Sequence, residues 1–570
     1  MNFTLYTIPE KVNLRRNVMV RRIVFRKLNA LVIGAALLVG LGSGRPASAI
    51  GIWDLADPAE FATGVQKVPA NSILNSVSCA TAWNCTTVGS FYNQDGDQEA
   101  FTQSSTDGVW SEALPVVFAA GVASNAPSAE LKVVSCASVG NCTAGGAFAT
   151  ASGGREAFTM TSTNGVWGQA TPAVFASGVQ NSTPDADVKA VQCVSVGNCT
   201  AVGRFTTPAG GGATGGFTMT LTNGVWGQAL PVVFASGVQN AVTSVGLESV
   251  SCASAGNCTA VGFFDNPLGS IEAFTVTSTN GVWAQARPAV FASGIQNASQ
   301  TTYLESVSCA SADNCTAAGN FRNTSGDVEA FTMTLTNGVW EQGRPAVFAT
   351  GIQNSNPDGR FNDVRCSTAG NCIAVGRFKN ASGDMEAFTM TSTNGVWGQG
   401  TPVVFASGVQ NSTPNDNLRS ISCATSDSCT AVGNFKNATG GTEAFTVSMT
   451  NSVWGQGTPA VFANGVQNSA LYAQFRSVSC ATANDCTTVG FFNSAAGGYE
   501  AVTMWTVNPN QATPTTVATP TTVASPGPET SEPSVLPETG TDGLRQWLIG
   551  SLFAFLAGAI LIVGRRRAPH

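Results

Sequence analysis

The residues best suited to chemistry in this chain are sixteen cysteines, arranged as eight pairs with five residues inside each pair. Regular cysteine pairs could bind zinc or form disulfides. Zinc sites use closer spacing and usually histidine, and the one histidine is the last residue, His570. We therefore predict disulfides, which suit an oxidising compartment. The predicted pairs are Cys79–Cys85, Cys136–Cys142, Cys193–Cys199, Cys252–Cys258, Cys309–Cys315, Cys366–Cys372, Cys423–Cys429 and Cys480–Cys486.

A second candidate for chemistry is an acidic turn around Gly96, with looser copies at 323–329 and 380–386. Alternating oxygen ligands around a glycine can hold Ca²⁺. We favour an ordinary solvated hairpin turn, keep Ca²⁺ as the alternative, and predict no other cofactor. The candidate ligands are Asn93, Asp95, Asp97 and Glu99.

Catalysis would require a nucleophile with a base, a metal, or paired carboxylates. The exported part of the chain has no histidine, its cysteines are predicted to be paired, and no serine or carboxylate differs clearly from the repeat background. We therefore predict that the protein is not an enzyme.

The spacing of the cysteines indicates a repeat array, because the first members of the pairs recur every 57 residues, with one interval of 59. Each unit alternates as strands do and contains turn residues at fixed places, which predicts four antiparallel strands with a disulfide closing the first hairpin. In one unit the predicted segments are strand 247–252, turn 253–257, strand 258–264, strand 272–278, turn 280–281 and strand 282–291.

The fourth strand carries a proline in every unit, from Pro58 to Pro459. Proline cannot donate to a strand ladder, so this strand should form the edge of a sheet. Four-stranded antiparallel units with one exposed edge are typical of β-propeller blades. The recurring tryptophans, phenylalanines and glutamates are then best explained by packing and structure rather than by sugar binding.

The ends of the repeat region predict a closed ring. The last unit stops after three strands near Val507, and residues 51–66 match the missing fourth strand. Trp53 lies 57 residues before Trp110, which is the usual spacing between repeats. The sequence therefore predicts an all-β, eight-bladed β-propeller over residues 50–507, closed by its N-terminal strand.

The segment Thr279-Asn280-Gly281-Val282-Trp283 and its copies resemble a shortened Asp-box of sialidase-type propellers. The spacing differs from that family, and Asn replaces Asp in most copies. The box is structural in sialidases, so the resemblance implies a fold rather than an activity. The arginine triad and Tyr/Glu pair of that family have no counterpart that we can place in the sequence.

The N-terminus is typical of a secretory signal peptide. A basic stretch is followed by an apolar run over 30–41 and by Ala47-Ser48-Ala49. We predict cleavage after Ala49, so that residues 1–49 are removed, with an uncleaved anchor as the alternative. Translation could start at Met1 or at Met19.

The C-terminus contains the pentapeptide Leu536-Pro537-Glu538-Thr539-Gly540, the apolar run 547–564 and three arginines. This order resembles the sorting signal of Gram-positive cell-wall proteins. The resemblance implies that a sortase cuts between Thr539 and Gly540 and joins Thr539 to peptidoglycan. The tail 541–570 would then cross the membrane only transiently; the alternative is a permanent single-span protein.

Two further features concern the exported chain. Residues 508–535 are rich in Pro and Thr, which predicts an extended stalk. Removing both ends lowers Lys plus Arg from 27 to 15 and Asp plus Glu from 34 to 32, leaving a net charge of about −17. Such a surface disfavours nucleic acid and anionic lipid, whereas a basic partner or a cation remains compatible.

We expect a ligand where the blades differ, because packing preserves the symmetry of a ring and a bound partner does not need to. The most variable stretches connect each fourth strand to the next blade. Candidate ligand residues there are Tyr303, Arg360, Phe361, Tyr472 and Phe475. The favoured function is a non-enzymatic, cell-wall-anchored adhesin for an unidentified surface or matrix ligand. The alternatives are a wall-anchored, sialidase-like glycan hydrolase and a passive coat protein.

Overall fold

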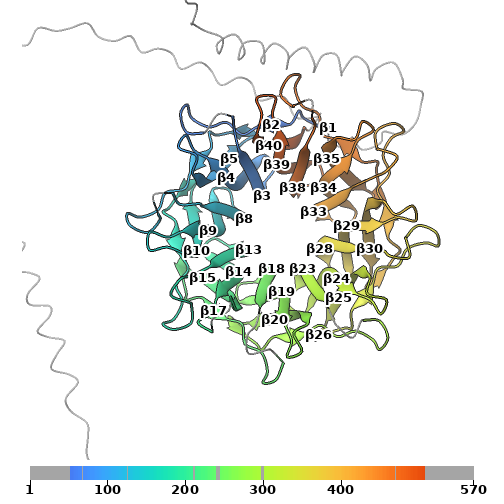
Figure 1. Cartoon of the computed structure of the whole chain (residues 1–570), viewed down its shortest axis with the longest axis horizontal. Coiled ribbons are helices and arrows are strands. Elements are labelled where there is room, and N and C mark those ends of the chain that lie inside the picture. The colour runs from blue at the N-terminus through green and yellow to red at the C-terminus, as the bar shows by residue number, and fades with distance from the viewer. Residues whose placement is uncertain are drawn as a thin grey trace, which may run out of the picture. The chain divides into compact units, whose positions relative to one another are not determined.

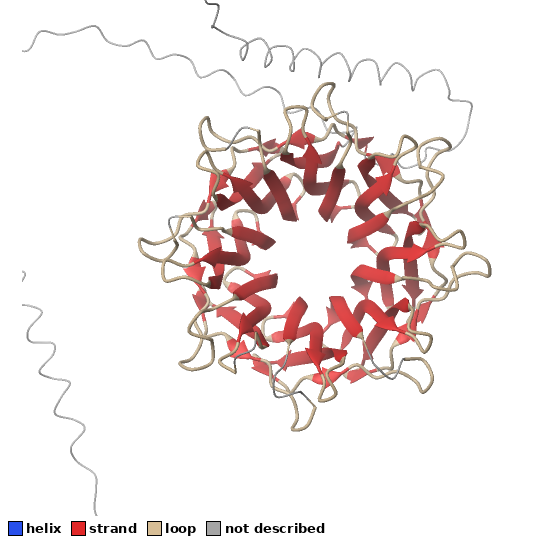
Figure 2. Cartoon of the chain, viewed as in Figure 1, coloured by secondary structure: helices blue, strands red, loops and turns tan. Residues whose placement is uncertain are grey.

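The computed structural model describes residues 52–507, apart from 67–68, 125, 210–211, 239–243, 297–300 and 469. Eight antiparallel sheets surround one central axis (Figure 1 and Figure 2), which confirms the predicted all-β, eight-bladed propeller. The described residues contain no helix, and so none that would cross a bilayer. The predicted signal peptide, stalk, sorting motif and hydrophobic tail lie outside the described residues.

Each blade contains three long antiparallel strands, which follow one another from the axis outward (Figure 1). The innermost strands are β3 (Ser72–Thr81), β8 (Glu130–Ser138), β13 (Ala186–Ser195), β18 (Val245–Ser254), β23 (Thr302–Ser311), β28 (Arg360–Thr368), β33 (Asn417–Thr425) and β38 (Ala473–Thr482). The second strands are β4 (Asn84–Tyr92), β9 (Asn141–Ala149), β14 (Asn198–Thr206), β19 (Asn257–Asp265), β24 (Asn314–Arg322), β29 (Asn371–Lys379), β34 (Ser428–Lys436) and β39 (Asp485–Asn493). The third strands are β5 (Gln98–Thr106), β10 (Arg155–Thr163), β15 (Thr214–Thr222), β20 (Ile271–Thr279), β25 (Val328–Thr336), β30 (Met385–Thr393), β35 (Thr442–Thr450) and β40 (Tyr499–Val507).

The fourth strand is not continuous, so the prediction of one strand over 282–291 is wrong. It consists of two short pieces, β21 (Val282–Trp283) and β22 (Arg287–Pro288), which both pair with β20. Three residues separate the pieces where only two separate their partners on β20, so the outer strand bulges between them. The other pieces are β1 (Ile52–Trp53), β2 (Asp57–Pro58), β6 (Val109–Trp110), β7 (Leu114–Pro115), β11 (Val166–Trp167), β12 (Thr171–Pro172), β16 (Val225–Trp226), β17 (Leu230–Pro231), β26 (Val339–Trp340), β27 (Arg344–Pro345), β31 (Val396–Trp397), β32 (Thr401–Pro402), β36 (Val453–Trp454) and β37 (Thr458–Pro459).

The ring closes as predicted, because β1 and β2 pair with β40 in the last blade. Side chains also cross the closure between the first and last blades. The backbone N–H of Cys79 donates to Ser479 Oγ at 3.0 Å, and the same bond joins Cys309 to Ser251 at 2.9 Å inside the ring. The closing contact is therefore an ordinary contact between blades.

All eight predicted disulfides are present, and the described residues include no free cysteine. Each links the first and second strands of one blade; Cys252 lies opposite Cys258, for example. The turn between the third and fourth strands is also as predicted. Asn280 and Gly281 both have positive φ, 51° and 83°, as the two-residue turns of tight hairpins require.

The core lies within and between the blades. In one blade Phe234 packs on Phe264 and Phe274, with ring centroids 4.7 Å and 5.0 Å away. The cluster around them also includes Val202 of the preceding blade. Each repeated tryptophan is half-buried and packs against one such cluster, as Trp283 does here, which supports the structural role predicted for these residues.

Candidate functional site

The two faces of the propeller carry different elements. One face, which we call the hairpin face, holds the disulfide turns and the Asn-Gly turns. These two turns contact each other in the same way in several blades. The N–H of Gly165 donates to the Gly140 carbonyl at 2.8 Å, and the N–H of Gly281 donates to the Gly256 carbonyl at 2.8 Å. The other face, the loop face, holds the turns between second and third strands and the connections between blades. Bridges such as Gln296–Asn323 join the two, so they share a face as predicted.

Every innermost strand contains a β-bulge on the inner wall of the ring, near the loop face. On β18, Leu247 lies opposite Gly262 and Ser249 opposite Val261, so Glu248 is the extra residue. The bulge requires close approach of two backbones, since a Cβ on Gly262 would lie 1.9 Å from the carbonyl oxygen of Gly246. A bulge redirects one side chain per strand, here on the strand nearest the axis.

The eight bulged residues form what we call the bulge ring. They occupy equivalent places in the eight blades but differ in chemistry. Several reach the neighbouring innermost strand: Asn75 Nδ2 donates to the Leu131 carbonyl at 2.8 Å, and Asn362 Nδ2 to the Leu418 carbonyl at 2.6 Å. The bulge ring consists of Asn75, Lys132, Lys189, Glu248, Glu305, Asn362, Arg419 and Arg476.

Four arginines from three successive blades gather on one side of this wall, and we call them the arginine arc. They are Arg360, Arg377, Arg419 and Arg476. Arg360 pairs with Asp358 at 3.6 Å, whereas among the described residues the other three have no carboxylate within ion-pair distance. Burial, together with the neighbouring arginine in the arc, lowers the pKa of Arg377, Arg419 and Arg476.

Neutral groups hold two members of the arginine arc in place. Arg419 Nε donates to Asn434 Oδ1 at 3.3 Å, and Arg476 Nη1 donates to Asn75 Oδ1. The guanidinium carbon of Arg476 also lies 5.0 Å from the ring centre of Phe491. Each guanidinium has five N–H donors in a planar fork, so most of its donors stay available to a ligand.

An aromatic group adjoins the arc in the last blade. Phe491 lies 5.0 Å from Tyr499 and 6.0 Å from Tyr472, between ring centroids. Tyr472 and Tyr499 keep 39% and 37% of their surface exposed, so their rings remain available to a partner.

The opposite side of the bulge ring carries charges of both signs. Asp187 is buried but lies within 2.6 Å of Lys132 Nζ and 3.6 Å of both Lys189 and Arg204. Burial alone would raise the pKa of Asp187, but these three cations lower it below its ordinary value.

Two further carboxylates of the bulge ring, Glu248 and Glu305, come from the next two blades toward the arginine arc and make no ion pair within the described residues. Burial raises the pKa of Glu248. Burial and the carboxylate of Glu248 raise the pKa of Glu305 to about 7, although Arg360 and Lys189 oppose the shift. Glu305 is therefore a carboxyl group that can hold a proton near neutral pH.

Three of the five predicted ligand residues lie on the loop face near this wall. Arg360 belongs to the arginine arc, Tyr472 to the aromatic group, and Tyr303 packs edge-on against Phe263 at 5.2 Å. The prediction is wrong for Phe361 and Phe475, which are fully buried.

The reason for this error is strand alternation. Phe361 and Phe475 each precede the bulged residue of their strand, so they face the core. Phe361 packs against Phe388 with ring centroids 5.0 Å apart. Sequence reasoning also missed the bulge ring. Aligning the eight repeats would have revealed this position, because its residue differs in charge from repeat to repeat.

The turn at 93–99 is organised by its own hydrogen bonds. Asn93 Oδ1 accepts from the backbone N–H of Asp95 and Asp97, at 3.0 Å and 2.9 Å, and Asn93 Nδ2 donates to Glu99 at 2.6 Å. The same Asn-to-Glu bond recurs at Asn323–Glu329, which supports the structural role predicted for the recurring glutamates. No three acidic, cysteine or histidine side chains gather to hold a metal in the described part of the chain, and calcium stays a prediction.

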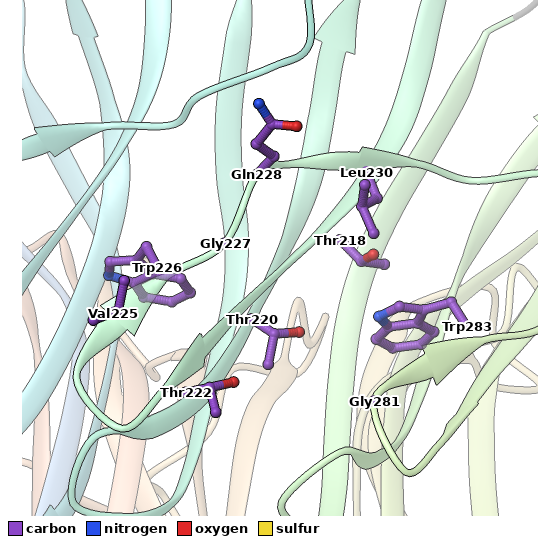
Figure 3. Close-up of a pocket in the computed structure, with 10 residues that line it drawn as sticks. All are labelled: Thr218, Thr220, Thr222, Val225, Trp226, Gly227, Gln228, Leu230, Gly281 and Trp283. Atoms are coloured by element: carbon purple, nitrogen blue, oxygen red, sulfur yellow. The ribbon is translucent and has the colours of Figure 1, made fainter. Parts of the chain in front are cut away.

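Shallow grooves also lie between neighbouring blades. One has a volume of about 480 Å³ and lies between Trp226 and Trp283, with Thr220 and Thr222 between them (Figure 3). An equivalent groove next to Trp340 and Trp397 has a volume of about 780 Å³. Because these grooves repeat, they follow from blade packing rather than from one specific site.

No family model matches the chain, and no curated protein matches it. Similar solved structures include a protein of unknown function from Dyadobacter fermentans, 11% identical over 59% of this chain and 97% of that one, with a TM-score of 0.31. A PL25 ulvan lyase is 8% identical over 80% and 95%, with a TM-score of 0.36. The Hadza microbial sialidase Hz136 is 10% identical over 71% and 73%, with a TM-score of 0.32. Identities this low carry no statement about activity.

Proposed function

We propose that this protein is exported, attached to the wall of a Gram-positive cell through Thr539, and binds a ligand without chemical turnover at the loop-face end of the propeller axis. The observation that carries the proposal is the bulge ring. The blades share their cysteines, tryptophans and edge prolines, yet the bulged residue on the axis differs in charge from blade to blade. Packing does not require such variety, whereas recognition of an asymmetric ligand does.

A second candidate function is glycan hydrolysis by a wall-attached enzyme. It is favoured by one observation: Glu248 and Glu305 are unpaired, and the pKa of Glu305 is raised to about 7, which would suit a general acid. Binding remains the preferred function, because a raised pKa also arises wherever two carboxylates share a partly buried wall.

The test is a glycan and matrix-protein array probed with the exported chain, residues 50–539. We expect a defined hit that is lost when Arg419 or Tyr472 is changed to alanine and kept when Arg344 is changed. Arg344 is a matched control because it is an exposed arginine on the outer strand β27, away from the axis. A hit that survives both axial changes would contradict the proposal, and shortened glycans on the array would establish the hydrolase.

A further inference from the structure

We infer that the arginine arc binds the acidic groups of an anionic polysaccharide. This inference rests on the proposed function, since it names the ligand class of the same axial site. It is carried by the charges, the hydrogen-bond partners and the aromatic neighbours of the arc.

The first step concerns charge. Four guanidiniums lie in series on one wall, and a single carboxylate, Asp358, is within ion-pair distance of any of them among the described residues. Like charges held together in a partly buried place destabilise the free protein. The exported chain is strongly acidic, at about −17. The charge of Glu130 acts on Arg476, but Glu130 lies beyond ion-pair distance of it and pairs with Arg155 at 3.6 Å instead. An acidic ligand would supply the missing counter-charge.

The second step concerns geometry. The contacts to Asn434, Asn75 and Phe491 are neutral, so they orient Arg419 and Arg476 without neutralising them. Arg360 Nε is buried and has no hydrogen-bond partner within the described residues. Oriented guanidiniums with free donors match carboxylate and sulfate groups, which accept two parallel hydrogen bonds.

The third step distinguishes a saccharide from other anions. The exposed ring of Tyr472 interacts electrostatically with Arg419 and Arg476, and the exposed ring of Tyr499 lies 6.1 Å from Tyr472. Flat aromatic faces beside polar groups suit a sugar ring, which has an apolar face and a hydroxylated edge. The arc spans three blades, so it can engage several acidic groups along one chain rather than a single ion.

The fourth step explains why the ligand should lie on one side of the axis. Glu248 lies across the axis from Arg476, Glu305 lies between Glu248 and the arc, and both repel an anion. The lysines across from the arc, Lys132 and Lys189, already pair with Asp187. A polyanion is therefore expected to contact blades with arginines and to avoid the blades that contain β18 and β23.

The experiment measures binding of the exported chain to four polymers at about 0.15 M salt, where nonspecific attraction is screened. The probes are polygalacturonate, dextran sulfate, neutral dextran and polyglutamate. We expect binding to one or both anionic polysaccharides, with Arg419→Gln and Arg476→Gln each weakening it about tenfold or more and the control Arg344→Gln changing it less than about twofold. Tyr472→Ala should weaken polysaccharide binding as well, because it removes the stacking face.

Four outcomes would overturn the inference: equal affinity for neutral dextran, equal affinity for polyglutamate, insensitivity to both arc substitutions, or no binding to either anionic polysaccharide. Circular dichroism and a thermal melt of each variant separate lost binding from lost folding. A neutral or protein ligand that is found on the array and depends on Arg419 would refute the ligand class while leaving the axial binding function intact.

Discussion

The indole Nε1 of Trp83 donates a hydrogen bond of 2.7 Å to Asp485 Oδ1, 402 residues later in the chain. This bond joins the first blade to the last. It lies on the hairpin face, next to the sheet that β1 and β2 complete. The stability of the whole ring thus depends on residues at the two ends of the repeat region.

Deleting residues 50–60 should therefore destabilise the entire propeller. The deletion removes both outer pieces from the last blade, together with Trp53 and the buried Ala56, and leaves β40 with an unpaired edge. We expect a loss of at least about 2 kcal/mol and self-association through the free edge. Thermal melts and size-exclusion chromatography measure both. A synthetic peptide of residues 50–66 should restore the monomer, and an unchanged melting temperature would contradict the closure.

Changing Gly262 to alanine should disrupt the bulge of β18. The new Cβ would lie 1.9 Å from the Gly246 carbonyl oxygen, so the two strands must separate. We expect a loss of about 1–3 kcal/mol in the free energy of unfolding. Gly227→Ala is the matched control, because a Cβ there meets its nearest atom at 3.5 Å and should change stability by less than about 0.5 kcal/mol. Similar losses for both variants would argue against a specific role of the bulge.

Changing Arg419 to glutamine should stabilise the unliganded protein while it weakens ligand binding. Partial desolvation inside the ring and the neighbouring Arg377 lower the pKa of Arg419, so the folded state disfavours the charged form. Because the side chain is exposed toward the axis, we expect a gain of at most about 1 kcal/mol. Chemical denaturation without ligand measures it. A clear loss of stability would mean that Arg419 serves the fold instead.

The stability of the protein should depend on the protonation of Glu305. Its pKa is about 7 in the folded state, against an ordinary value of 4.5, so the folded protein retains a proton that the unfolded chain releases. Stability contributed by this group is full below about pH 4.5 and declines as the pH rises to about 7. Glu305→Gln should melt higher than the wild type at about pH 8 and equally near pH 4.5.

The other titratable and charged groups near Glu305 are present in both the wild type and the Glu305→Gln variant. They are Glu248 on β18, Tyr303 on β23, Arg360 on β28 and Lys189 on β13. Buried Asp416, whose pKa is also raised to about 7, is present in both proteins too, so its titration does not change the difference between their melting temperatures. A melting difference that does not vary between pH 4 and 8 would refute the assigned proton. Below pH 7 the neutral Glu305 should also strengthen binding of an anion.

Changing Thr539 to alanine should prevent attachment to the wall. In a host with a sortase, we expect the wild type in the fraction that a muramidase releases and the variant in the membrane or the medium. Thr521→Ala, outside the pentapeptide, is the matched control. Equal amounts of wild type and Thr539→Ala in the muramidase fraction would contradict sorting through this motif.

The sequence by itself determined the period, the disulfide partners, the edge prolines and the closure by residues 51–66. These features depend on the spacing of residues along the chain. Strand alternation and the intervals between cysteines are visible in the sequence without coordinates. The pairing of Cys252 with Cys258 and of Trp53 with Thr506 follows from such local or periodic information.

The tertiary structure alone decided which residues meet on the axis. A single extra residue in a strand shifts the alternation after it, so Phe361 and Val364 are both fully buried although three residues apart, while Asn362 between them reaches the next blade. Likewise Arg377, Arg419 and Arg476 come from different blades, and no local pattern links them. They become neighbours because closing the ring brings equivalent strands together around one axis, and there their charges act on each other.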